Sequence, residues 1–561
     1  MSDWFRAESQ HFIVYSDTTE KNVAILLDNL ERLDYLLRIY TRDYIKTAEP
    51  EPKLTLYFND RVNGFNVIAA DRPADAIGLY NSCTAGVQGL GVQLGRIAEL
   101  SNEQLVKHPL DDSLSYIFEA YARHFLYRHT DIRMPVSFIE GFAQYFSSVR
   151  FSSKRMVLGR MPTNVGSYLK FLDDGHRYSL TYLDILEPDG RENKNYAGPA
   201  GAQLEFEAKS WLLTHYMMSS EDRRTRMRNY LKLVHRDTAP AQAFEEAFGM
   251  KVKDLSNAMW RYHLNSIQVL EVDLPSLPIA NVGFSSLSQS AGEFLIGEAK
   301  LKSCPNQREG EALLHALAAE AAKFPGSDAA HLALSRAQVD WGKAQDALPY
   351  LDKAIEQGKG GFDAVYLSGM ANLRLAEQSD GAARRSYLDA SRNRLLRARG
   401  MNPKSPEAAL AFLRSEVLAG APDAAALDGV ISAWQDNREI PALARSAALS
   451  LAYQGDGVKA ESILRSMIRN TRSPKAAAWA TGWQNSLDAG LSQSAILAEM
   501  RNEPASNTEF NSAFKEWTID NESVMQRVAY NAGLENAQGV IDQQMQDPDP
   551  AKALYGAPVG K

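Results

Sequence analysis

Two short stretches of the chain carry the side chains that could do chemistry. The first contains Glu119, Arg123 and His124, and the second places Glu140 directly before a glycine. Carboxylates and an imidazole could bind a metal ion that activates water. Arg123 cannot join such a site because its guanidinium stays protonated. Glu119 and Arg123 are four residues apart, so on a helix they would form an ion pair, and Arg123 could also reach Glu140.

The two stretches, Tyr116–Leu126 and Met134–Phe146, resemble the gluzincin-type, peptidase MA-like domains that bacteria often fuse to tetratricopeptide repeats. In that family His-Glu-x-x-His on one helix supplies two zinc ligands and the general base. Glu-Gly-x-Ala-x-Tyr on the next helix supplies the third ligand. The resemblance implies that Glu119 and Arg123 stand at the histidine positions and Ala120 at the position of the base.

The resemblance therefore implies a degenerate site formed by Glu119, Ala120, Arg123 and Glu140, of which only Glu140 keeps a ligand type. Alanine cannot act as a base, so we expect no catalytic residue, no bound metal and no cofactor. Two alternatives stay open. Glu119 and Arg123 could face solvent instead of pairing, or an altered metal site could use both glutamates and a histidine.

The surrounding pattern predicts an α+β domain, which the resemblance implies is zincin-like. Three further segments extend the resemblance over residues 1–265: Trp4–Ser16, Ala208–Tyr216 and Ala243–Gly249. We expect strands over 11–15, 53–58 and around 77–80, and mainly helices after Leu110. A helix should begin at the Asp17-x-x-Glu20 signal and run to the mid-forties. Strands followed by helices are typical of the α+β class.

The second half of the chain is expected to be all-α and resembles tetratricopeptide repeats, which implies a superhelix of helix pairs. The whole protein should be mostly α. Stop-and-restart signals recur near Phe324–Asp328, Met401–Glu407 and Gln454–Asp456, each between stretches rich in alanine and leucine. An irregular helical bundle is the alternative. The expected domains are 1–270 (peptidase-like), 271–290 (linker), 291–485 (repeats), 486–540 (a C-terminal helical segment) and 541–561 (a flexible tail).

Composition limits the partners and the compartment. The net charge of −8 argues against general nucleic-acid binding, and no apolar run is long enough for a transmembrane helix. Cys83 and Cys304 are far apart in sequence, so a disulfide is not expected. Relatives commonly carry an export signal before the first strand, which favours the bacterial periplasm or cell envelope. A native N-terminus at Met1 would favour the cytoplasm.

Several other residues have a plainer explanation than a functional one. His124 and His129 could be replacement metal ligands, but His124 is off the helical face of Glu119, and His215 is expected to be a core histidine. The glycines from Gly86 to Gly95 indicate a turn or hairpin. Basic runs over 223–236 and 384–399 indicate solvated helix faces, with docking of an acidic partner or membrane as the alternative.

These observations favour a non-catalytic scaffold that binds a protein or peptide through its helical repeats. The alternative is a zinc-dependent peptidase or other hydrolase with an altered metal site, against which Ala120 argues. A holdase that grips unfolded segments is a third hypothesis. The sequence leaves the partner, the pathway and the oligomeric state open.

Overall fold

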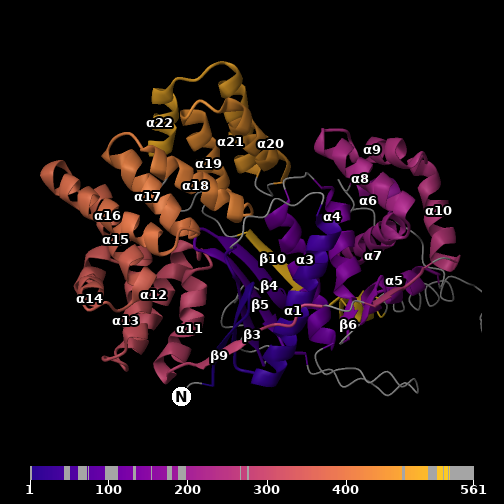
Figure 1. The fold of residues 1–561 in the computed structure, drawn as a ribbon, viewed down its shortest axis with the longest axis horizontal. Helices are drawn as coiled ribbons and strands as arrows, with labels where there is room; N and C mark the ends of the chain where they lie inside the picture. The colour runs from indigo at the N-terminus through magenta and orange to yellow at the C-terminus, as the bar shows by residue number, and fades with distance from the viewer. Residues whose placement is uncertain are drawn as a thin grey trace, which may run out of the picture. The chain divides into compact units, whose positions relative to one another are not determined.

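The computed structural model gives a mostly helical protein, 68% helix, in which an N-terminal mixed β-sheet with helices precedes many consecutive packed helices (Figure 1). The described residues are 3–42, 51–60, 73, 75–94, 111–130, 134–152, 155–173, 180–187, 198–265, 267–273, 277–470, 474–502, 514–521, 523–528 and 530. They form two compact units. Unit 1 comprises Met1–Arg133 with Leu274–Thr518, and unit 2 comprises Met134–Asp273 with Ile519–Lys561.

A mixed sheet lies in unit 1, and within the described ranges it has seven strands in the order β10-β4-β5-β3-β2-β1-β9. Strands β2, β3 and β5 run parallel, whereas β1–β2, β1–β9 and β4–β5 are antiparallel pairs. The strands are β1 (Phe5–Glu8), β2 (Phe12–Ser16), β3 (Leu54–Asn59), β4 (Ala76–Cys83), β5 (Gly86–Val92), β9 (Gly283–Ser286) and β10 (Phe514–Ile519). The three strands expected from sequence are therefore confirmed as β2, β3 and β4.

The glycine-rich stretch forms the hairpin predicted for it. β4 and β5 are joined by a two-residue turn, and Gly86 has φ +118°, which a side chain would disfavour. Gly89 lacks a side chain for a different reason, because an added Cβ would collide with Leu56 on the neighbouring strand.

Two helices pack on this sheet, α1 (Glu20–Thr41) and α3 (Asp111–His129). The apolar positions of α1 at helical spacing are buried, as predicted. Its start differs from the prediction, because Thr19 caps the helix by accepting from the backbone N–H of Asn22. Asp17 instead accepts from the backbone N–H of Asp60, 2.7 Å away. The expected end in the mid-forties is wrong for the part described, since the helix stops at Thr41.

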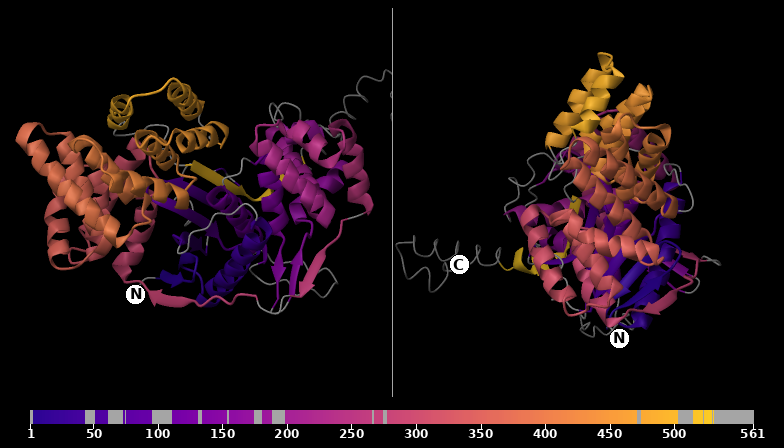
Figure 2. Two further views of the ribbon diagram at one scale, coloured as in Figure 1. Left: turned by 45° about the horizontal axis from the view of Figure 1, so that its top comes forward. Right: turned by 90° about the vertical axis from the view of Figure 1, so that its left-hand side faces the viewer.

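The outer strands of the sheet come from distant parts of the chain. β9 pairs with β1 near the N-terminus (Figure 2), and β10 lies beside β4. Part of the expected linker, 271–290, is therefore built into sheets, because β8 (Leu270–Asp273) and β9 both pair. Neither β9 nor β10 was expected from the sequence.

Unit 2 is a helical body with a small antiparallel sheet. Trp211 and Phe206 of α7 are fully buried in its core, together with Phe244. Its described helices are α4 (Val136–Ser147), α5 (Thr163–Asp173), α6 (Tyr182–Leu186), α7 (Gly198–Met218), α8 (Glu221–His235), α9 (Pro240–Phe248) and α10 (Val252–Asn265). Its strands are β6 (Arg150–Phe151), β7 (Arg155–Leu158) and β8.

Consecutive helices make up the rest of unit 1. They are α11 (Gln289–Leu301), α12 (Gln307–Ala321), α13 (Asp328–Trp341), α14 (Ala344–Glu356), α15 (Gly361–Glu377), α16 (Gly381–Met401), α17 (Pro406–Ala419), α18 (Ala424–Asp436), α19 (Pro441–Tyr453), α20 (Gly457–Asn470), α21 (Pro474–Asp488) and α22 (Gln493–Arg501). From α11 to α21 each helix packs on the next, and α22 packs on α17 and α19. Each predicted stop-and-restart signal coincides with the gap between two helices. Small side chains permit close packing, and an added Cβ on Gly310 would collide with the Trp341 ring.

The prediction that the two cysteines do not form a disulfide is wrong. Cys83, at the end of β4, forms a disulfide with Cys304, which follows α11, and their Cα atoms are 5.9 Å apart. The two cysteines are 221 positions apart, so a bond was not expected from the sequence, but the fold brings both into unit 1. No helix within the described ranges is both long and apolar enough to cross a membrane. The predicted domain boundaries remain predictions, and the expected flexible tail lies outside the described residues.

Candidate functional site

Helix α3 carries most of the predicted site, and one of its faces packs against the sheet. Ile117, Ala120, Tyr121 and His124 are spaced three or four residues apart and line a cavity of about 40 Å³ with residues of α1, β3, β4 and β5. The walls are mostly apolar. Ala120, at the position implied for the catalytic base, therefore contributes a methyl group to an apolar internal wall.

The neighbouring face of α3 carries the predicted ion pair. The guanidinium of Arg123 donates to the carboxylate of Glu119 at 2.5 Å, and its Nε lies 3.7 Å from Glu516 of β10. The side chains of Arg123 and Glu119 are only 8% and 13% exposed. The pairing interpretation is thus confirmed over the solvent-facing one. Glu516, supplied from almost 400 residues away, could not have been found by local spacing.

Glu140 lies on α4, in unit 2, so its predicted approach to Arg123 stays a prediction. Its Oε1 accepts from the Gln144 side chain one helical turn later, at 3.3 Å. The glycine that follows has a packing role. An added Cβ on Gly141 would meet Thr214 and the backbone carbonyl of Ser210, both on α7.

His124 belongs to a buried cluster at the end of α3. Its Nδ1 is 2.7 Å from the Tyr80 hydroxyl, which also donates to Glu439 at 3.1 Å. Glu439 comes from the connection between α18 and α19, and its backbone carbonyl accepts from Ser82 at 3.0 Å. Burial, and secondly the charge of Arg128, holds the pKa of His124 well below its ordinary value.

Burial also raises the pKa of the Glu439 carboxyl, although Arg128 opposes this shift. Its side chain is 3% exposed, and among the described residues no hydrogen-bond partner is found for its buried Oε2. A neutral imidazole, a phenol and a carboxyl thus connect the helical array to the sheet and α3. Sequence reasoning missed Glu439 because nothing local marks it.

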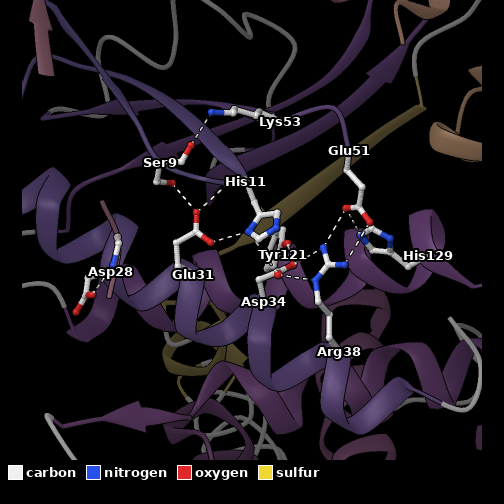
Figure 3. A network of polar contacts seen from close by, with 11 residues as sticks. Ser9, His11, Asp28, Glu31, Asp34, Arg38, Glu51, Lys53, Tyr121 and His129 are labelled. Carbon is white, nitrogen blue, oxygen red and sulfur yellow. Dashed lines mark hydrogen bonds and ion pairs between the residues drawn. The ribbon is translucent and has the colours of Figure 1, made fainter. Parts of the chain in front are cut away.

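A second polar network joins α1, α3 and the start of the sheet (Figure 3). His11 Nδ1 lies 2.6 Å from Glu31 Oε2, and Ser9 donates to the other oxygen of Glu31 at 2.7 Å. Asp34 accepts from Tyr121 at 2.7 Å and from Arg38 at 2.6 Å.

Charge balance keeps this network ionised although it is buried. Burial alone would lower the pKa of His11, but the hydrogen bond to Glu31 and the charge of Asp34 outweigh it, so the pKa of His11 is raised. Burial alone would raise the pKa of Glu31, but the hydrogen bonds from His11 and Ser9 outweigh it, so the pKa of Glu31 is lowered. Arg38 extends the network to Glu51 at 2.9 Å. The carboxylates of the network are engaged by cations and hydroxyls. The geometry is therefore that of a structural network joining α1 and α3.

His129 and His215 are part of the packing. His129 is buried, 3.7 Å from Glu51, and burial followed by the charge of Arg128 lowers its pKa well below the ordinary value. His215 has contacts at both ring nitrogens, with Tyr262 at 2.7 Å and with the carbonyl of Gly159 at 3.1 Å, which confirms the core interpretation. Among the residues that the structure describes, no three His, Cys, Asp or Glu side chains form a metal-binding group.

Part of each basic run is engaged in ion pairs within the protein. On α8, Arg224 and Arg228 pair with Glu221, and Arg226 pairs with Asp222. On α16, described members pair with acidic residues of neighbouring helices, Arg392 with Glu416 and Arg394 with Asp352. These contacts favour helix faces stabilised by internal ion pairs over docking patches.

Comparisons with protein-family models, with curated proteins and with solved structures found no match for this chain.

Proposed function

We propose that this protein is a non-catalytic binding or scaffolding protein, with a zincin-like domain that has lost its metal chemistry and tetratricopeptide-like helices that hold a protein or peptide. The observation that carries the proposal is the buried Arg123–Glu119 pair on α3. At the two positions where the resembled family has histidines, this chain has a cation and its counter-ion.

The ion pair opposes metal binding as well as replacing the ligands. Arg123 holds a permanent positive charge beside Glu119 and Glu516, the carboxylates that a metal would otherwise attract. Separating a buried ion pair costs about 3–5 kcal/mol, so a second cation would have to overcome that loss. Ala120 adds no base, because its side chain is a methyl group, and that group lines the apolar cavity.

The binding half of the proposal is supported by the helical array. Helices α11–α21 pack each on its neighbour, with small residues at the contacts and breaks at the predicted signals. Stacked helix pairs of this kind offer extended surfaces to peptides and proteins.

Metal content tests the first half. Elemental mass spectrometry of the full chain should find far less than one zinc per chain, and a Glu119→His/Arg123→His variant should take up more. Ala120 is left unchanged in this variant because a glutamate there would be buried in an apolar wall. One zinc per wild-type chain would overturn the proposal.

A casein peptide mixture tests binding and catalysis together. Peptides retained intact by the full chain, analysed by mass spectrometry, would support binding without cleavage. New cleavage products that disappear with a chelator would instead establish the hydrolase.

A further inference from the structure

The disulfide joins two parts of unit 1 that the sequence separates widely. Cys83 ends β4 in the sheet, and Cys304 lies in the turn after α11, the first helix of the array. Their Cα separation of 5.9 Å is within the range that a disulfide spans without backbone movement. These are the only cysteines in the sequence, so each has one intramolecular partner.

The two ends of the bond have different surroundings. Cys83 is 2% exposed, whereas Cys304 is partly exposed. Cys304 also has φ 51°, a left-handed backbone conformation that residues with a side chain seldom adopt. Cys304 is therefore the more accessible of the two cysteines, while β4 keeps Cys83 buried. The Thr84 hydroxyl lies beside both sulfurs, 3.7 Å from Cys304 and 3.9 Å from Cys83.

We propose that this disulfide is a redox-controlled clamp between the sheet and the helical array, and that it closes and opens by thiol–disulfide exchange at Cys304. The co-reactant is an external disulfide, from a small thiol or a protein, as found in an oxidising compartment. The inference does not depend on the proposed function, because it needs only the positions of the two cysteines.

Closure takes two exchange steps. The Cys304 thiolate attacks the external disulfide RSSR, forms a mixed disulfide Cys304–S–S–R and releases one thiolate RS⁻. The Cys83 thiol then loses its proton and attacks the Cys304 sulfur, which releases the second RS⁻. Two protein thiols are oxidised by two electrons and one external disulfide is reduced to two thiols, with the two protons going to the released thiolates.

Opening follows the reverse order, because an incoming thiolate reaches the partly exposed Cys304 before the buried Cys83. Once the bond is open, the end of β4 keeps non-covalent ties to the array through Ser82 and Tyr80, which both bond to Glu439. Reduction thus loosens the connection without removing it.

The first test counts thiols. The full chain produced in an oxidising compartment should not react with maleimide-polyethylene glycol before reduction. The full chain produced in a reducing cytosol should react at up to two sites after denaturation. Two free thiols in the protein from the oxidising compartment would overturn the proposal.

The second test locates the exchange. Reduced native protein is treated with glutathione disulfide, quenched with acid and digested for mass spectrometry. The glutathione adduct should appear on Cys304, and it should accumulate in Cys83→Ser. Glutathione should modify Cys304 in the Cys83→Ser variant about tenfold faster than it modifies Cys83 in the Cys304→Ser variant, because access controls thiol reactivity.

Equal rates at the two cysteines, or faster modification of Cys83, would contradict the asymmetry. The adduct trapped in the wild-type chain decides the question if a single variant folds poorly.

Discussion

Gly141 is the residue at which the packing of α4 can be tested most sharply. An alanine there would place its Cβ 2.8 Å from the carbonyl carbon of Ser210, and closer still to the Ser210 oxygen and the Thr214 hydroxyl. The Thr214 side chain could rotate, but Ser210 contributes backbone. Helix α7 would therefore have to move away from α4.

The size of the effect follows from two opposed contributions. Replacing glycine by alanine within a helix stabilises by about 1 kcal/mol. Overpacking that shifts a helix backbone costs about 3 kcal/mol. We expect Gly141→Ala to lower the free energy of unfolding of unit 2 by about 2 kcal/mol as the difference of these contributions.

Gly166→Ala is the matched control, since it also lies in a helix of unit 2. Its added Cβ would meet only the flexible side chain of Met161, at 3.2 Å from the sulfur. This variant should be as stable as the wild type, or more stable by up to about 1 kcal/mol.

Hydrogen exchange followed by mass spectrometry is the suitable assay, because it reads peptides of α4 and α7 separately from unit 1. Those peptides should lose protection in Gly141→Ala and keep it in Gly166→Ala. If Gly141→Ala leaves their exchange unchanged, or slows it as the control does, the close approach of α7 is not what requires glycine after Glu140.

Three further predictions concern buried charges. Arg123→Ala should destabilise by about 3 kcal/mol because it leaves the Glu119 carboxylate buried, and a denaturation double-mutant cycle with Glu119→Ala should give a coupling above about 1 kcal/mol; independent effects would refute the pair. Arg336→Met should cost about 3–5 kcal/mol, since Arg336 and Glu407 form two buried hydrogen bonds of 3.0 Å, and adding Glu407→Leu should recover part of this loss in the same measurement. The pKa of Glu439 is raised in the folded state, so its contribution to stability is fully present below pH 4.5 and is lost as the pH rises. The melting temperature of Glu439→Gln should therefore rise relative to that of the wild type as the pH increases. A difference in melting temperature that does not change with pH would contradict the shift.

The features that the sequence predicted depend on local signals. Proline, glycine and serine between alanine-rich stretches marked the helix ends around Phe324–Asp328 and Met401–Glu407, because these residues act on their immediate neighbours. The Glu119–Arg123 pair was predicted for the same reason, since a four-residue spacing on a helix brings the two side chains together.

The features that the sequence did not predict depend on long-range contacts. Glu516 beside Arg123, Glu439 beside Tyr80 and the Cys83–Cys304 bond each join residues more than 200 positions apart. A pattern within a helix or strand carries no information about such partners. Their identity follows only from the path of the chain.

The strand order of the large sheet has a consequence for synthesis. The inner strands are complete by Val92, but the edges beside β1 and β4 are covered only by β9 and β10, and β10 ends at Ile519. At ordinary translation rates, the time between synthesis of Val92 and synthesis of Ile519 is on the order of a minute. Until then the nascent chain exposes unpaired strand edges, which attract other strands. The ribosome would therefore release a protein whose first domain to emerge is among the last to be finished, and a holding chaperone that recognises extended edges would raise its yield.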